Sequence, residues 1–97
     1  MPVYYVNSYN ITNQEEYAKY GPPTIELLHK YGAEVLAADL QAIGVEGKPL
    51  QMNAIIKFPS EAAALQCYAD PAYQPLKAIR WGSTGNCSMI LVHGLEG

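Results

Sequence analysis

Strand and helix patterns follow one another along this chain in the order β-α-β-β-α-β, and this order restricts the possible folds more than any other feature. The four predicted strands cover residues 3–11, 33–40, 50–58 and 87–93. Helical patterns lie between the first two strands and between the last two. Right-handed crossovers turn this order into four antiparallel strands with helices on one face, which is an α+β sandwich.

The first helical segment has a clear start and an expected interruption. Asn13 and Glu16 have capping-box spacing, so the helix is predicted to begin near residue 14. Residues 21–23 are Gly-Pro-Pro and are expected to kink or break it, because proline lacks an amide donor. Gly32 is expected to end the segment.

The second helical region contains two predicted starts. Ser60 is expected to cap an alanine-rich helix that ends at Ala69. Asp70 is expected to cap a second helix with Pro71 at its first position, where the missing amide costs nothing. The remaining connections, predicted from glycine, proline and serine content, are a hairpin loop at residues 43–49 and a loop at residues 82–86. Together these elements predict a ferredoxin-like fold.

Length and composition limit the possible functions. A chain of 97 residues is expected to form one domain over residues 1–97. The net charge of -3 with scattered cations argues against binding to nucleic acid or to an acidic membrane surface. The N-terminus has no basic region followed by a long apolar run, so a soluble cytoplasmic protein is expected. Cys67 and Cys87 fit no metal or disulfide spacing and are expected to be reduced.

Two strands carry apolar residues at consecutive positions, at 54–56 and 89–92. Such runs place apolar side chains on both faces of a sheet, whereas one helical layer covers only one face. We therefore expect the second face to pack against another copy, giving a homodimer with a barrel-like interior.

Several segments resemble the small bacterial family known as domain of unknown function 1330. They are ITNQEEYAKY from residue 11, KYGAEVL from 30, VEG at 45–47 and FPSEAAALQCYADPAYQPLKAIR from 58. The resemblance spans most of the chain and implies a dimeric α+β barrel, an architecture shared with small cofactor-free monooxygenases, haem-degrading enzymes and lactone isomerases. It does not imply their chemistry.

The chain departs from this family pattern at three positions. Asn13 replaces an expected acidic residue, Ala33 follows Gly32 where a second glycine is expected, and Cys67 replaces an aromatic residue before Tyr68. The change at Cys67 removes bulk, so either the local pocket is larger or Trp81 fills part of that space.

The best ligand-binding candidates lie near the second helical region. Arg80 is either a helix cap or ion-pair partner, or an anchor for an anionic ligand at a pocket mouth. Phenol rings offer an apolar wall with a hydrogen-bonding group, although a single tyrosine is more often half-buried core than a ligand contact. The candidate wall residues are Tyr17, Tyr20, Tyr68 and Tyr73. Asn7, with Glu34 and Asn53, is a strand polar residue that could point into the dimer barrel.

Proton-transfer candidates are few. His29 and Glu46 are weak candidates for catalysis, because a surface or rim histidine and a solvated turn charge are the preferred explanations for them. His93 has only Glu96 as a nearby carboxylate in the sequence, so no metal site is expected. No motif for a cofactor is present, and Ser83-Thr84-Gly85 is predicted to be a turn. Three hypotheses remain: a small-molecule-binding homodimer, a cofactor-independent oxygenase or isomerase, and a structural or interaction module.

Overall fold

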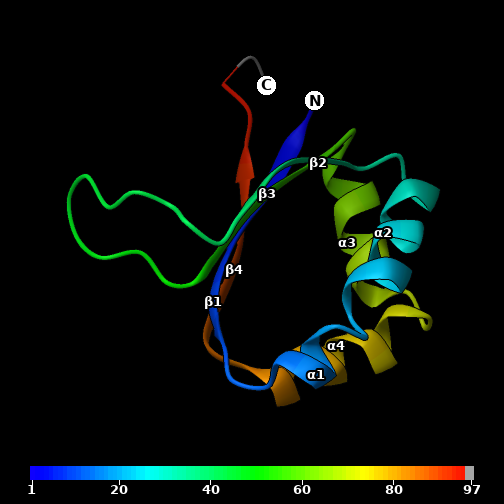
Figure 1. Cartoon of the computed structure of the whole chain (residues 1–97). Coiled ribbons are helices and arrows are strands. Elements are labelled where there is room, and N and C mark those ends of the chain that lie inside the picture. Colours follow the sequence, from blue (N-terminus) through cyan, green and yellow to red (C-terminus); the bar gives the residue numbers. More distant parts are fainter. Residues whose placement is uncertain (96–97) are drawn as a thin grey trace.

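One antiparallel sheet forms the frame of the molecule in the computed structural model, which describes residues 1–95. Its strands are β1 (Val3–Ile11), β2 (Glu34–Asp39), β3 (Met52–Phe58) and β4 (Thr84–His93). They are arranged in the order β2-β3-β1-β4 (Figure 1). This is the ferredoxin-like arrangement of an α+β sandwich, so the fold class predicted from the element order is confirmed.

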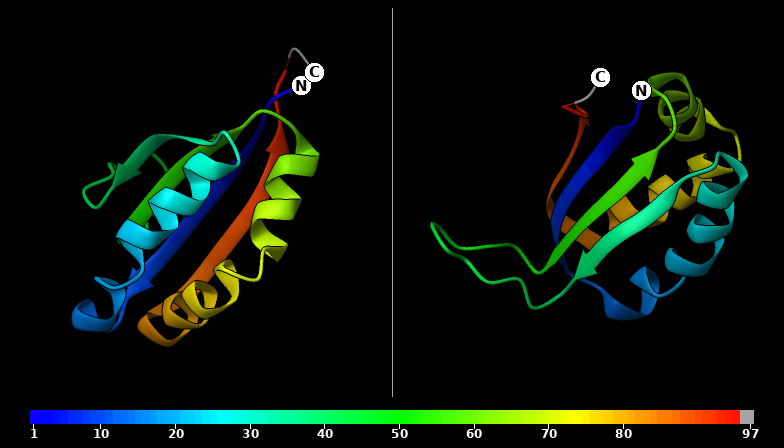
Figure 2. Two further views of the ribbon diagram at one scale, coloured as in Figure 1. Left: turned by 90° about the vertical axis from the view of Figure 1, so that its right-hand side faces the viewer. Right: turned by 90° about the horizontal axis from the view of Figure 1, so that it is seen from above.

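The helices lie on one face of the sheet and leave the other open (Figures 1 and 2). They are α1 (Gln14–Tyr17), α2 (Gly21–Lys30), α3 (Glu61–Ala69) and α4 (Tyr73–Ser83). None of the helices within residues 1–95 has the length and apolar character needed to cross a bilayer.

Side chains along β1 point alternately to the two faces of the sheet. Val3, Tyr5, Asn7 and Tyr9 are buried toward the helices, as the two-residue period of a strand requires. The intervening side chains point to the open face. Phe58 on β3 lies opposite Val3 and is fully buried, so the core sits between the sheet and the helical layer.

The first helical segment is broken where the sequence predicts. The Glu16 amide donates to Asn13 Oδ1 at 3.1 Å, but α1 lasts only 4 residues. A new helix, α2, starts at Gly21 and has proline in its first turn, where amides need no helical partner. The restart at Gly21 resets the helical phase, and Ile25 on α2 is 47% exposed.

The second helical region begins as predicted at Ser60 but differs at Asp70. Ser60 Oγ accepts the Ala63 amide at 3.1 Å. Asp70 Oδ1 accepts the Ala72 amide at 2.7 Å, which closes a turn, and α4 begins only at Tyr73. The prediction of Pro71 as the first helical residue is therefore wrong, because the aspartate side chain stabilises a turn before the helix.

The loop predicted at residues 82–86 does not exist. The chain passes from α4 directly into β4 at Thr84, and Ser83 is fully buried. The Ser83 carbonyl accepts the Thr12 amide at 2.8 Å, and Ser83 Oγ donates to the Ile79 carbonyl at 2.6 Å. Since these bonds satisfy the helix end, no turn is required and the prediction for Ser83-Thr84-Gly85 is also wrong.

Strand β2 is short, exposed and irregular. It occupies one edge of the sheet, and its pairing with β3 shifts register between Val35 and Ala37. The chain then leaves the sheet at residue 40 and returns at 51, so the connection is longer than the predicted hairpin loop at 43–49.

A network around Asp70 joins α2 to the turn before α4. The Tyr31 hydroxyl donates to Asp70 Oδ2 at 2.5 Å, and Lys30 Nζ donates to the same oxygen at 3.3 Å. The hydrogen bond from Tyr31, then that from the Ala72 amide, and finally Lys30 hold the pKa of Asp70 below its ordinary value of 3.8.

This network predicts a specific loss of stability in acid. A pKa lowered by folding means that the carboxylate stabilises the protein above pH 3.8 and that this contribution is lost as the pH falls through the folded-state pKa. Urea unfolding from about pH 6 to about pH 2 should therefore show a shallower acid limb for Asp70→Asn than for the native chain. Glu26→Gln, which changes an exposed carboxylate, is the control. An unchanged limb in Asp70→Asn would contradict the role of the network.

Candidate functional site

A pocket lies between the sheet and the helical layer. β1 and its two neighbouring strands supply the floor, because Asn7 pairs with Met89 and Tyr5 with Ile56 in register. Helices α2, α3 and α4 supply the walls and roof. The lining residues are Tyr5, Asn7, Tyr20, Thr24, Leu27, Leu28, Ile56, Phe58, Cys67, Tyr68, Tyr73 and Met89.

The pocket is narrow in this conformation. The centre of a water molecule can occupy about 30 Å³, whereas the empty space including the mouth is about 350 Å³. The empty volume of about 350 Å³ lies at the lower end of the range typical of ligand pockets, about 300–1,000 Å³. A ligand larger than one or two water molecules therefore requires side-chain movement, for example of Tyr20, Tyr68 or Tyr73 on the helical side of the pocket.

Hydrogen bonds already engage most of the phenols around the pocket. Tyr5 donates to the Ala64 carbonyl at 3.0 Å, and the hydroxyls of Tyr20 and Tyr73 lie 2.7 Å apart. Burial raises the pKa of Tyr5 to about 12. Burial, together with the neighbouring Tyr73, also raises the pKa of Tyr20. These phenols are neutral at physiological pH.

Asn7 is the exception among the polar groups of the pocket. Its side chain is buried in the floor, and its Oδ1 accepts no hydrogen bond from any group within residues 1–95. Thr24 differs, because its hydroxyl donates to the Tyr20 carbonyl at 2.5 Å. Buried side-chain acceptors are normally satisfied, so Asn7 marks a place where a donor is missing.

Arg80 lies deeper than the sequence suggested. It is only 3% exposed, does not line the pocket, and its Nη1 donates to Cys87 Sγ at 2.7 Å. Within residues 1–95 its Nε has no acceptor and no carboxylate forms an ion pair with it. The predictions of a helix cap and of an ion pair are therefore wrong, and the side chain lies behind the pocket lining instead of at its mouth, since the pairing of β4 with β1 buries it.

Burial and the surrounding phenols act in opposite directions on Arg80. Burial lowers the pKa of the guanidinium, whereas Tyr73 and Tyr20 raise it by more, so the net pKa is raised. Arg80 is therefore charged, and it lies next to two tyrosines that line the pocket.

A continuous row of tyrosine rings connects this arginine region to the pocket. Tyr9 and Tyr17 share a hydroxyl contact of 2.6 Å, and Tyr17 stacks on Tyr20 with centroids 6.0 Å apart. Tyr20 continues to Tyr73 at 6.4 Å, and Tyr73 to Tyr68 at 5.5 Å. Tyr17 belongs to this row but does not line the pocket, unlike the other three predicted wall tyrosines.

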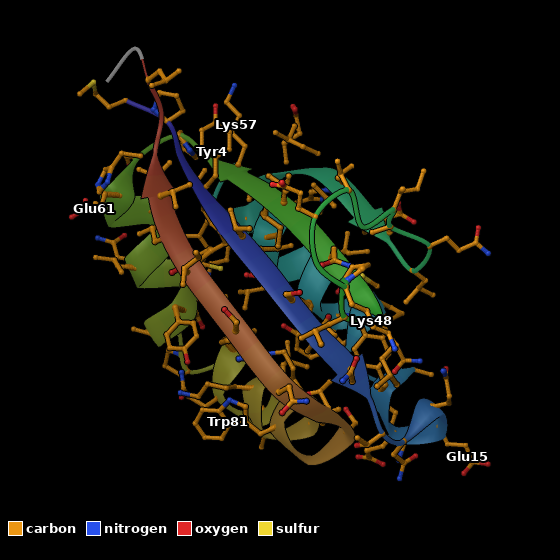
Figure 3. All side chains as sticks on the ribbon, turned by 90° about the vertical axis from the view of Figure 1, so that its left-hand side faces the viewer. Tyr4, Glu15, Lys48, Lys57, Glu61 and Trp81 are labelled. Carbon is orange, nitrogen blue, oxygen red and sulfur yellow. The ribbon has the colours of Figure 1, made fainter. Side chains whose placement is uncertain are left out.

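Cys67 lines the pocket, whereas Trp81 does not fill the space beside it. Trp81 is 60% exposed on the outer side of α4, where Lys77 Nζ lies 5.1 Å from its ring centroid (Figure 3). The suggestion that Trp81 replaces an aromatic residue at position 67 is therefore wrong. Burial raises the pKa of the Cys67 thiol to about 11, so it is a neutral wall group. Both cysteines are free.

The family described as Domain of unknown function (DUF1330) matches residues 2–95. The chain belongs to this family. The recognition of the family from sequence segments is thereby confirmed. No curated protein matches the sequence.

Solved structures share the fold of this DUF1330 member. RPA0582, a protein of unknown function from Rhodopseudomonas palustris, has a TM-score of 0.79 and 21% identity, covering 99% of this chain and 84% of that one. SnoaB, a cofactor-independent oxygenase from Streptomyces nogalater, has a TM-score of 0.71 and 14% identity, covering 96% and 92%. A dimeric protein of unknown function with a ferredoxin-like fold from Bacteroides fragilis has a TM-score of 0.58 and 9% identity, covering 96% of both chains. These identities establish similarity of fold alone.

The weak catalytic candidates lie away from the pocket. His29 is exposed on α2, and Glu46 is exposed in the connection between β2 and β3, so the structure does not bring them together. His93 is paired with Glu61, whose Oε1 lies 2.6 Å from Nε2. This contact across 32 residues was invisible in the sequence, and Glu96 lies outside the described residues.

Some pocket residues were missed although the sequence carried a signal for them. Tyr5 lies two residues before Asn7 on the same face of β1, and Thr24, Leu27 and Leu28 follow Tyr20 at helical spacing. Other lining residues depend on strand register and helix packing, which leave no local signal. They are Ile56, Phe58 and Met89. Asn7 faces the helices and not the open face, so its predicted direction into a dimer barrel is wrong.

Proposed function

We propose that this protein binds a small organic molecule with a mainly apolar body in the pocket between sheet and helices. The observation that carries the proposal is Asn7, whose buried Oδ1 lacks a donor within residues 1–95. Leaving such an acceptor unsatisfied costs about 1–3 kcal/mol, and a ligand that donates to it recovers that free energy. The ligand is therefore expected to carry a hydroxyl, an amide or a protonated acid group.

The tyrosines favour a flat or aromatic ligand body. The hydroxyls of Tyr5, Tyr20 and Tyr73 are already engaged, so these residues offer their rings to a ligand. Aromatic rings pack well against other rings in offset or edge-to-face geometry. Leu27, Leu28 and Met89 add aliphatic contacts around them.

The buried charge of Arg80 favours a ligand that also carries an anionic group. A buried charge without a counter-charge is costly, and no carboxylate within residues 1–95 compensates this one. A carboxylate directed toward Tyr20 and Tyr73 would approach the guanidinium and lower that cost. A hydroxylated aromatic acid combines these features.

The likeness to SnoaB supports a second candidate, a cofactor-independent oxygenase acting in the same pocket. An enzyme of this kind needs a group that moves a proton near neutral pH. The lining groups are unsuited, since burial raises the pKa of Tyr5 to about 12 and of Cys67 to about 11. Binding is therefore the favoured function, and oxygen consumption in the presence of a bound ligand would favour the oxygenase instead.

We further propose that two copies pack through their open sheet faces. Ile55, Ile90 and Val92 project from that face and remain partly exposed in the single chain. Covering such side chains contributes about 25 cal/mol for each Å² removed from water. The similar fold of a dimeric protein from Bacteroides fragilis also supports this arrangement.

The pocket proposal predicts a clear effect of Asn7→Leu on ligand binding. Leucine has the same branching as asparagine, with bulkier methyl groups in place of the amide, and it cannot accept a hydrogen bond, so the chain should keep its fold and lose the ligand anchor. A thermal-shift screen with phenols and with aromatic and aliphatic carboxylic acids should reveal compounds that raise the melting temperature of the native chain. In Asn7→Leu the same compounds should produce no shift.

Thr24→Val is the matched control. It removes a polar group from the same pocket, but that group is already bonded to the Tyr20 carbonyl. The ligand-induced shift should therefore persist in Thr24→Val. A compound that stabilises Asn7→Leu as strongly as the native chain would place the ligand elsewhere and overturn the proposal.

A further inference from the structure

The connection between β2 and β3 forms a projecting arm. The arm comprises residues 40–51 and leaves the sheet on the side opposite to the helices (Figure 1). In the view onto the open face, the arm stands in front of the sheet, with Lys48 on it and Lys57 and Tyr4 near the other end of that face (Figure 3). The arm and the open face therefore point in the same direction.

Hydrogen bonds hold the base of the arm in a defined position. The Gln51 amide donates to Asn10 Oδ1 at 3.1 Å, and the Ile11 amide donates to Gln51 Oε1 at 2.8 Å. At the start of the arm the Gln41 amide donates to Asp39 Oδ1 at 2.7 Å. These contacts tie both ends of the arm to the sheet, so it is an ordered projection.

The turn within the arm is also tightly built. A Cβ atom at Gly44 would lie 2.3 Å from the Gly47 carbonyl oxygen and 2.8 Å from Pro49 Cδ. Gly47 has a φ of +84°, in the left-handed region that favours glycine. The arm thus has a specific shape that larger residues at these positions would disturb.

The tip of this ordered arm presents apolar side chains to solvent. Ile43 is 88% exposed and Val45 is 90% exposed. Exposed apolar surface of this kind is found at interaction sites. No segment within residues 1–95 covers them.

We propose that the arm clasps a second copy of this chain, which its apolar tip contacts when the open faces pack together. This inference rests on the sheet-to-sheet dimer proposed above and adds a role for residues 40–51. A partner that packs on the open face also contacts the arm, because the arm and the open face lie on the same side of the molecule (Figures 1 and 3). Two-fold symmetry then places the arm of each copy against the other.

The charges on these surfaces fit an identical partner. The open face carries Glu34 beside Lys57, and the arm carries Glu46 close to Lys48. A surface with both signs can match its own copy after a two-fold rotation, whereas a surface with one sign would repel it. A groove at the base of the arm offers space for side chains of the second copy. Asn10, Leu40, Ala42, Lys48, Pro49, Leu50 and Gln51 line it.

The test compares dimer dissociation constants, measured by light scattering and sedimentation over a dilution series. The double variant Ile43→Ser/Val45→Ser should raise the constant at least about tenfold, because each dimer loses four apolar contacts. The matched control, Ile25→Ser/Leu65→Ser, removes two exposed apolar side chains from the helical side and should leave the constant within about twofold. Hydrogen exchange at residues 43–47 of the native chain should slow at concentrations that favour the dimer.

The outcomes separate the two proposals. A native chain with only the 10.6 kDa monomer mass at micromolar concentration would overturn the dimer and the clasp together. A dimeric native chain with an unchanged dissociation constant in the arm variant would overturn the clasp alone, and the sheet-to-sheet dimer would stand. Circular dichroism of each variant checks that the fold is intact.

Discussion

Phe58→Ala is expected to lower the free energy of unfolding by about 3–5 kcal/mol. Phe58 is 0% exposed, and its ring meets Tyr5 edge to face with centroids 5.5 Å apart. Removing the ring deletes this contact and leaves a cavity beside the pocket, which the surrounding side chains can close only in part. A domain of this size is stabilised by about 5–15 kcal/mol, so the variant should lose a large share of its stability.

Urea denaturation of the native chain and the variant measures this effect. Leu65→Ala is the control, because Leu65 is 52% exposed and its truncation should cost less than about 1 kcal/mol. A loss below about 1 kcal/mol in Phe58→Ala would mean that the core between sheet and helices is packed differently.

Arg80→Met should have the second largest effect, in the stabilising direction. The guanidinium is buried, and the groups that raise its pKa are phenols and a thiol, which are uncharged near pH 7. A side chain of similar length without charge removes the cost of burying that ion, so we expect a gain of about 1–4 kcal/mol in unfolding free energy. The same variant should lose binding of anionic ligands. A buried charge that costs stability is expected to persist where ligand binding requires it.

Lys19→Met provides the comparison for Arg80→Met. Lys19 forms an exposed ion pair with Glu16 at 3.1 Å, so its replacement should change stability by less than about 0.5 kcal/mol. Denaturant unfolding at pH 7 measures both variants. A destabilised Arg80→Met would show that the guanidinium is compensated by interactions beyond the Cys87 contact.

Local chemistry explains what the sequence could predict. Strand β1 follows from alternation and β-propensity, and the caps at Asn13 and Ser60 follow from side chains that bond amides three residues later. The break before α2 follows from consecutive prolines. The element order then decided the sheet topology.

Long-range contacts explain what the sequence could not predict. The burial of Arg80 depends on β4 pairing with β1, which brings Cys87 next to the guanidinium. The direct passage from α4 into β4 depends on Thr12, which meets the Ser83 carbonyl from 71 residues away along the chain (83 − 12). The lack of a donor to Asn7 Oδ1 depends on all the side chains that surround it in the folded protein, and the sequence does not show which these are.

The irregular edge strand β2 affects how far association can proceed. A regular, exposed edge would offer its backbone amides and carbonyls to further chains and allow open-ended fibres. The register shift between Val35 and Ala37 interrupts that ladder, and Glu34 and Asp39 place negative charges at its two ends. Growth by strand addition is thereby discouraged, while the broad face of the sheet stays available for a closed pair. The same sheet can thus support assembly to a finite size and resist polymerisation.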